Sequence, residues 1–185
     1  MNPMDVFGEG DTRSQGLFIF NVKSTQMTPT LVKILRYLLI EKAENGVVFS
    51  IDRPSTFLRS LLEHQGVPQQ KLMYLDAVSN ISGETSPHDD RRDLFTSPFC
   101  TNLFPELVCC KSTAVAGVRN GFVAVDNLGA LQPYMTDPCV EKLVRALKNL
   151  GGHSPDFKCI IMMDKGSSPE LFDVLSRNGA REVSL

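Results

Sequence analysis

The segment from Leu17 to Leu31, LFIFNVKSTQMTPTL, constrains the fold more than any other part of the sequence. Its first four residues form a bulky apolar run, which predicts a short buried strand. Pro29 is followed by apolar residues at helical spacing, so the sequence predicts that a helix begins there. A loop of a few residues should therefore join the strand to the helix. In α/β proteins, backbone N–H groups and the helix dipole at such a turn often hold a phosphate.

This loop lacks most of the residues that a phosphate-binding P-loop needs. That motif consists of Gly, four residues, Gly, Lys and then Ser or Thr, because glycines permit unusual backbone angles and lysine supplies positive charge. Asn21 and Gln26 stand at the two glycine positions, and Met27 stands at the lysine position. Thr28 alone matches the motif, and Pro29 has no N–H to donate to an anion. The geometry of a phosphate site is therefore expected without most of its chemistry.

The composition is that of a globular domain without a strong charge bias. The chain has 185 residues, of which 42% are hydrophobic, and a formal net charge of -2. This length fits one domain, and the small negative charge makes nucleic acid an unfavoured partner. No apolar run approaches the roughly 18 residues that span a bilayer, and the N-terminal residues lack the apolar segment of a signal peptide. We therefore expect a cytoplasmic protein that does not enter a membrane.

No spacing of cysteine or histidine predicts a metal site. The five cysteines are odd in number and contain no C-x-x-C motif, and the three histidines are far apart in sequence. Cys109 and Cys110 are adjacent, which suits neither a ready disulfide nor a pair of zinc ligands. We expect reduced thiols and no bound metal.

Short apolar runs alternate with amphipathic helix patterns, which predicts an α/β fold. The predicted helices are 29–45, 54–66, 137–151 and 168–179, and the predicted strands are 17–20, 47–51, 71–76, 122–126, 157–163 and 182–185. A polar loop is expected over 82–98 and a further helix over 101–117. We expect an irregular lead-in over 1–16 and a single domain over 17–185. Its mostly parallel sheet should carry helices on both faces.

Two segments resemble parts of the KaiC-like and RecA-like ATPases. The segment VVFSIDRPSTFLRSLLEHQGVPQQKLMYLDAVS resembles the second strand, the following helix and the third strand of that family. The segment GFVAVDNLGALQPYM resembles its Walker B strand and the loop that follows. The order of elements agrees from Gly16 to the C-terminus. The resemblance implies a RecA-like three-layer α/β sandwich, a site for ATP with Mg²⁺, and assembly into rings through this domain.

The resemblance also implies roles for individual residues. Asp126 falls where the Walker B aspartate positions Mg²⁺ through water, and Asp52 falls where the family has a glutamate that activates the attacking water. Thr28 falls at the Mg²⁺-binding hydroxyl. Asp52 is one methylene shorter than glutamate, and Arg53 follows where a second acid is common in the family; both departures weaken hydrolysis. The family's lysine has no counterpart because Met27 stands there, which removes a charged hydrogen-bond donor from the phosphate site. The nucleotide site that the resemblance implies, in vestigial form, comprises Asn21, Lys23, Ser24, Thr25, Gln26, Met27, Thr28, Asp52 and Asp126.

Three of these residues have structural interpretations that need no ligand. Asp126 could cap a turn, Asp52 precedes Pro54 as a helix-entry residue, and Thr28 before Pro29 could be an ordinary N-cap. We favour these interpretations because the P-loop is incomplete.

The leading hypothesis is a catalytically inactive RecA/KaiC-like domain that works as an interaction or regulatory module without a cofactor. Ring assembly in the family implies protein partners, either further copies of this chain or an active paralogue. The alternative is a divergent nucleotide-binding ATPase that uses ATP and Mg²⁺. In that case Lys23 or a partner's arginine would replace the missing lysine. A weaker third hypothesis is binding of single-stranded nucleic acid, which the slightly acidic balance does not favour.

Overall fold

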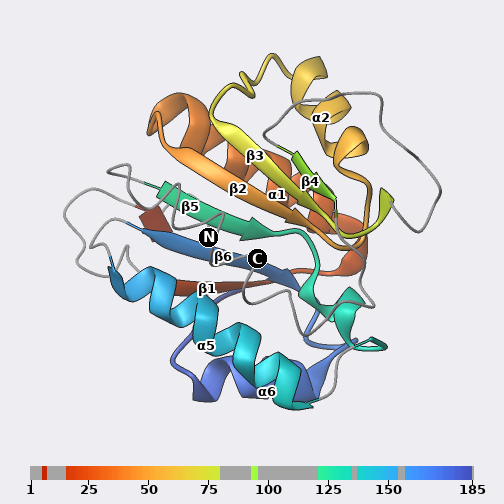
Figure 1. Ribbon diagram of the computed structural model, residues 1–185, viewed down its shortest axis with the longest axis vertical. Coiled ribbons are helices and arrows are strands. Elements are labelled where there is room, and N and C mark those ends of the chain that lie inside the picture. Colours follow the sequence, from red (N-terminus) through yellow and green to blue (C-terminus); the bar gives the residue numbers. More distant parts are fainter. Residues whose placement is uncertain are drawn as a thin grey trace.

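The apolar runs of the sequence form the strands of one parallel sheet (Figure 1). The computed structural model describes residues 6–7, 16–79, 93–95, 121–134, 137–153 and 157–184. Within these ranges the strands are β1 Gly16–Asn21, β2 Asn45–Ser50, β3 Leu72–Asp76, β4 Asp93–Phe95, β5 Gly121–Val125, β6 Lys158–Met163 and β7 Arg181–Ser184. They pair in the order β4-β3-β2-β5-β6-β1-β7, and every pairing is parallel. All carboxyl ends therefore lie at one edge of the sheet.

Helices cover both faces of this sheet and give the molecule three layers (Figure 1). The α-helices of the described ranges are α1 Ser24–Arg36, α2 Ser55–His64, α5 Asp137–His153 and α6 Pro169–Arg177. Successive residues of a strand point to opposite faces. Leu17 and Ile19 accordingly pack in one apolar core with α5 and α6, whereas Phe18 and Phe20 pack in a second core with α1 and α2. The predicted α/β three-layer architecture is confirmed.

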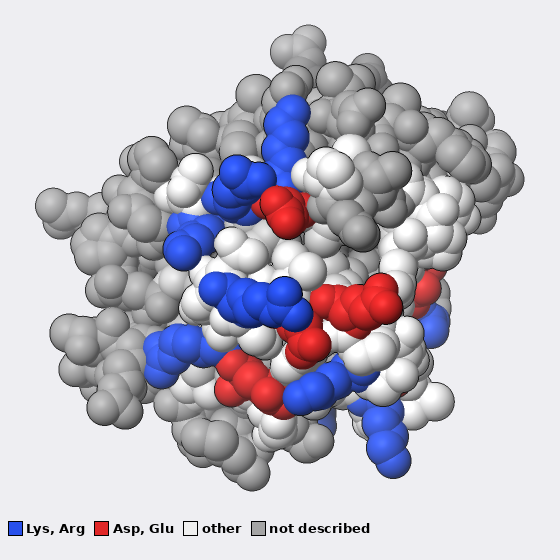
Figure 2. Space-filling model, turned by 90° about the horizontal axis from the view of Figure 1, so that it is seen from below, with Lys and Arg blue, Asp and Glu red and all other residues white. Residues whose placement is uncertain are grey.

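The outer face of α5 and α6 carries charged side chains of both signs (Figure 2). Amphipathic packing explains this arrangement, because Leu143, Val144 and Leu147 of α5 are buried against the sheet and leave the charged residues of the helix outside. None of the helices within the described ranges is long and apolar enough to cross a membrane.

The prediction that the first helix begins at Pro29 is wrong, because α1 begins at Ser24. Proline is disfavoured inside a helix since it lacks the N–H that bonds to the preceding turn. Tertiary contacts override this preference here: Met27 and Leu31 are only 4% and 1% exposed and pack in the core. Thr28 is consequently inside α1 and is not its N-cap. The helix continues into a π-helical turn, Tyr37–Glu41, which ends before the predicted residue 45.

The other helix boundaries agree more closely with their proline and glycine signals. Pro54 and Pro169 stand at the starts of α2 and α6, and Gly66 and Gly179 follow their ends with φ of 67° and 86°. Only glycine adopts such angles without strain, so the ends of these two helices could be predicted from the sequence. The α5 helix instead runs to His153 and includes the two glycines that were expected to end it. Phe57 of α2 is 39% exposed.

The structure changes two expectations for irregular segments. Strand β4 lies within the predicted loop 82–98, where Leu94 pairs with Leu75 at the edge of the sheet; an edge strand needs little apolar sequence because only one side is paired. In the predicted lead-in 1–16, Phe7 is 3% exposed and its ring lies 5.5 Å from that of Phe18. The predicted helix 101–117 lies outside the described residues, as do Cys100, Cys109 and Cys110.

Candidate functional site

A cleft opens at the carboxyl edge of the sheet, next to the N-terminus of α1. Its volume is about 410 Å³, which is within the range of small-molecule sites. The described residues that line it are Ser24, Met27, Asp52, Asn127, Gly129, Ala130, Gln132, Pro133, Asp164, Ser167 and Ser168. These residues come from the start of α1 and from the segments that follow β2, β5 and β6. Open parallel sheets commonly bind ligands at this edge.

The N-terminus of α1 is bonded to a carboxylate of the chain itself. The backbone N–H and the hydroxyl of Ser24 donate to Oδ2 of Asp164, at 3.3 and 3.2 Å. The N–H of Gly166 donates to Oδ1 of Asp164 at 3.0 Å. Slight burial works to raise the pKa of Asp164, but these donors outweigh it and hold the pKa below its usual value. An ionised carboxylate therefore occupies the position where a helix N-terminus would otherwise receive an anionic ligand.

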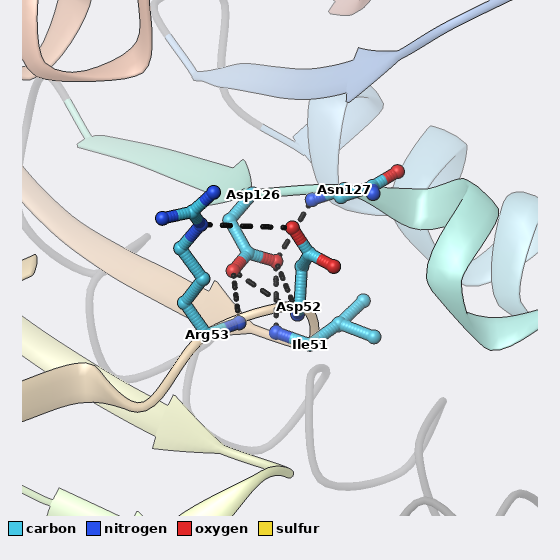
Figure 3. Close-up of polar contacts among 5 residues, drawn as sticks. All are labelled: Ile51, Asp52, Arg53, Asp126 and Asn127. Carbon is cyan, nitrogen blue, oxygen red and sulfur yellow. Dashed lines mark hydrogen bonds and ion pairs between the residues drawn. The ribbon is translucent and has the colours of Figure 1, made fainter. Parts of the chain in front are cut away.

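Asp126 is a buried carboxylate bonded to two residues that line the cleft, Asp52 and Asn127 (Figure 3). It is 7% exposed and accepts hydrogen bonds from four backbone N–H groups: those of Ile51 (2.8 Å), Asp52 (3.2 Å), Arg53 (3.4 Å) and Asn127 (2.8 Å). It thereby fastens the segment after β2 to the end of β5.

The titration of Asp126 is shifted toward neutral pH. Burial raises its pKa from 3.8 to about 7, and the nearby negative charge of Asp52 adds to that effect. The backbone N–H donors act in the opposite direction without cancelling the shift. Asp126 can therefore change its charge near pH 7, while it holds a backbone segment that borders the cleft.

Asp52 lies at the surface and lines the cleft. Its side chain is 43% exposed, and Nε of Arg53 lies 3.8 Å from Oδ2 of Asp52 (Figure 3). The guanidinium of Arg53 also lies over the ring of Phe57, 5.1 Å from its centroid, a favourable cation–π arrangement. The guanidinium therefore contacts the ring of Phe57, which is 39% exposed.

Asp76 is bonded to the N-terminus of α2, as Asp164 is bonded to the N-terminus of α1. Its carboxylate accepts hydrogen bonds from the N–H of Ser55, the first residue of α2, at 2.6 Å, and from the N–H of Ser79 at 2.9 Å. Burial works to raise the pKa of Asp76, but these bonds dominate and lower it. The negative charge is thus stabilised at the positive end of a helix dipole.

These three aspartates share one arrangement that the sequence analysis did not identify. Asp76, Asp126 and Asp164 each end or directly follow a buried strand, namely β3, β5 and β6. Each accepts backbone N–H bonds from the segment after another strand, β1 or β2. A signal existed in the sequence, because all three strand segments end in aspartate: LMYLD, GFVAVD and KCIIMMD.

The structure gathers only some of the residues of the predicted nucleotide site. Ser24, Met27 and Asp52 line the cleft, and Asp126 is buried and bonded to the backbone of Asp52. Asn21 is not among the described lining residues; its side chain donates to Oε1 of Glu182 at 3.1 Å and accepts from the N–H of Lys165 at 3.2 Å. The remaining members are not among the described lining residues; they are Lys23, Thr25, Gln26 and Thr28.

The expected phosphate loop is not formed. Strand β1 ends at Asn21 and α1 begins at Ser24, so Val22 and Lys23 alone connect them. Val22 is 4% exposed, and its N–H donates to the carbonyl of Met163 at 2.9 Å. The connection between β1 and α1 therefore contains only two backbone N–H groups, and that of Val22 is already bonded. Among the residues that the structure describes, no group of three or more His, Cys, Asp or Glu side chains is arranged to hold a metal ion.

Of the comparisons with known proteins, only the comparison with solved structures gives matches. No protein-family model and no curated protein matches the sequence. The KaiC-like protein PH0186 of the hyperthermophilic archaeon Pyrococcus horikoshii OT3 has a TM-score of 0.63 at 14% identity, covering 92% of this chain and 74% of that one. PH0250 of the same organism has a TM-score of 0.57 at 12% identity, covering 91% and 81%.

A third P. horikoshii protein, PH0321, was solved in complex with an unknown peptide. It has a TM-score of 0.64 at 12% identity, covering 89% of this chain and 74% of that one. At identities this low, TM-scores of 0.57 to 0.64 show a shared fold alone. The chain described here therefore has the RecA/KaiC-like α/β fold.

Proposed function

We propose that this chain is a catalytically inactive RecA/KaiC-like domain that acts as an interaction or regulatory module. The observation that carries the proposal is the bond between Asp164 and the N-terminus of α1. A triphosphate would have to displace this carboxylate and would gain no glycine-rich loop in return. The helix dipole, which favours anions elsewhere, is already stabilised by the chain's own negative charge.

The charge of the cleft supports the same proposal. Two carboxylates, Asp52 and Asp164, line it, and none of its described lining residues is Lys, Arg or His. Met27, at the position of the phosphate-binding lysine, is 4% exposed and has no charge to offer. Like charges a few ångströms apart repel each other strongly at low local dielectric. A nucleotide phosphate entering the cleft would therefore meet repulsion where active relatives provide attraction.

Proteins are the partners that this proposal implies, either further copies of the chain or an active paralogue. One solved structure with the same fold, PH0321, contains a bound peptide. The chain's net charge of -2 gives no general attraction to nucleic acid. A domain with an intact core and a blocked phosphate site retains its surface as its means of action.

The test is a titration with Mg-ATP in which two quantities are measured: the Tm of thermal unfolding and the release of phosphate. We expect neither turnover nor a shift of Tm at millimolar Mg-ATP, whereas a ligand at 100 times its Kd would add about 2.7 kcal/mol of stability. Asp164→Ala frees the N–H of Ser24 and removes one negative charge, so inorganic phosphate should raise the Tm of this variant alone. Asp173→Ala is the matched control, because it removes the same charge from the exposed face of α6.

A divergent nucleotide-binding ATPase is the second candidate function, favoured by the 410 Å³ cleft beside α1. ATP and Mg²⁺ would then be held without a P-loop, with Lys23 at the N-cap of α1 as the nearby cation. Lys23→Met distinguishes the two functions. Saturable binding of Mg-ATP that weakens in this variant, accompanied by phosphate release, would establish the ATPase and overturn the inactive domain.

A further inference from the structure

A second hollow lies on the outer layer of helices, between α5 and α6. Its volume is about 270 Å³, and its described lining residues are Gln132, Val140, Glu141, Glu170, Leu171, Asp173, Val174 and Arg177. We call it the α5–α6 groove. Its floor is apolar: Leu171 is 6% exposed, and the two valines pack against the core below while remaining partly open to solvent.

The rim of the groove is acidic. Glu141, Glu170 and Asp173 are exposed, and the only cation among the described lining residues is Arg177. Glu141 is paired with Arg145 on the same helix at 3.1 Å, but neither Glu170 nor Asp173 forms an ion pair within the described part of the chain. Figure 2 shows this face of the molecule, where acidic and basic side chains alternate.

The groove and the cleft at the carboxyl edge share one lining residue, Gln132. The two hollows together present five carboxylates, those of Asp52, Glu141, Asp164, Glu170 and Asp173. Arg177 is the one positively charged side chain among the described lining residues of the two hollows. Asp52 and Glu141 are paired with Arg53 and Arg145, so the local concentration of negative charge comes from the other three carboxylates. Such a concentration attracts cationic partners and repels phosphates.

We propose that the α5–α6 groove is the docking site for a basic, amphipathic segment of a different protein. An apolar side chain of that segment would enter the groove, and lysines or arginines beside it would face Glu170 and Asp173. The inference rests on the proposed function as an interaction module and names the chemistry of its partner. The apolar floor supplies the affinity and the acidic rim supplies the selection for positive charge.

The probe is a fluorescein-labelled synthetic amphipathic helix of leucine and lysine, measured by anisotropy at physiological salt with the full chain. The groove variant is Glu170→Lys with Asp173→Lys. Its matched control is Glu41→Lys with Glu63→Lys, which changes the net charge equally at exposed positions on α2 and at the end of the π-helical turn after α1. We expect the groove variant to bind at least about tenfold more weakly, or about 1.4 kcal/mol. The control should bind as the unmodified chain does.

Additional probes separate the groove from general attraction. Polylysine, which has no apolar side chains, should bind more weakly than the amphipathic peptide; equal binding would overturn the role of the apolar floor. Should the double lysine variant fail to fold, Glu170→Gln with Asp173→Gln removes the charge more gently and should weaken binding in the same direction. Unchanged peptide affinity in either folded variant overturns the proposal.

Light scattering tests the alternative occupant of the groove, which is a second copy of the chain. Self-association that the groove variant abolishes, without peptide binding by the unmodified chain, would assign the groove to a homodimer and overturn the proposed partner. The Mg-ATP assay is read separately. Phosphate release with normal peptide binding contradicts only the inactive domain, whereas absence of both contradicts only the groove.

Discussion

At the scale of single residues, three aspartates at strand ends organise the carboxyl edge of the sheet. A carboxylate after a buried strand could be recognised in the sequence, and a turn cap was the favoured interpretation of Asp126. The donors could not be predicted, because the bonded partners are 21 residues apart for Asp76, 75 for Asp126 and 140 for Asp164. Only the strand order brings these donors and acceptors together. Local sequence reasoning therefore did not predict the bond between Asp164 and the N-terminus of α1.

Asp126 should make stability fall as pH rises toward 7. Its pKa is about 7 in the folded chain and near 3.8 when unfolded, so between these values the folded state binds more protons. The free energy of unfolding then decreases with pH, by up to about 1.4 kcal/mol per pH unit for one group. Asp126→Asn should remove this slope. Chemical unfolding of both proteins at several values between pH 5 and 8 measures it.

Asp76→Asn is the control for this experiment. The pKa of Asp76 is lowered in the folded chain, so its stabilisation is complete above its unfolded value of 3.8 and is lost only as pH falls below that value. The variant should lose stability by an amount that stays constant from pH 5 to 8. Parallel pH profiles for the unmodified chain and Asp126→Asn would contradict the shifted titration.

At the scale of elements, the strands were predicted better than the first helix. Buried strands leave a direct trace in a short apolar run, so the predicted cores of β1, β2, β5 and β6 agree with the structure. The start of α1 could not be read from Pro29, because buried Met27 and the bond to Asp164 extend the helix toward its N-terminus. Strand β4 was not predicted, because an edge strand of three residues is too short to show a hydrophobic pattern.

Gly46 in β2 should tolerate no side chain. A Cβ at this position would overlap the ring of Phe122, its neighbour on β5, which is fully buried. Strand propensity alone would make Gly46→Ala stabilising by about 0.5–1 kcal/mol. Overpacking should reverse that sign and destabilise the chain by about 1–3 kcal/mol in denaturant unfolding. Phe122→Leu in the same chain should recover part of the loss, and stability of Gly46→Ala at or above that of the unmodified chain would refute the overlap.

At the scale of the whole molecule, a buried ion pair joins distant parts of the chain at the amino edge of the sheet. Nζ of Lys158, at the start of β6, lies 2.7 Å from Oε1 of Glu44, just before β2, and the two side chains are 8% and 5% exposed. Strand β5 lies between these two strands. No pattern in the sequence predicts a pair separated by 114 residues. The three-layer arrangement itself was predictable, because alternating strands and helices allow few other folds.

Lys158→Met should destabilise the chain by about 3–5 kcal/mol, since it leaves the charge of Glu44 buried without its cation. Combining it with Glu44→Leu removes both charges and should restore most of that stability. Denaturant unfolding of both single variants and the double variant gives the coupling energy between the two residues. Strictly additive losses would show that the two side chains act independently.

The position of β1 in the sheet has a consequence for biosynthesis. The first strand of the chain pairs only with β6 and β7, the last two strands. A nascent chain emerging from the ribosome can therefore assemble β2, β3 and β5 while β1 still has no neighbour, so its four buried apolar residues need shielding until residue 158 and beyond have been made. Such long-range pairing slows folding, and the unpaired strand of the incomplete chain exposes apolar surface that favours aggregation.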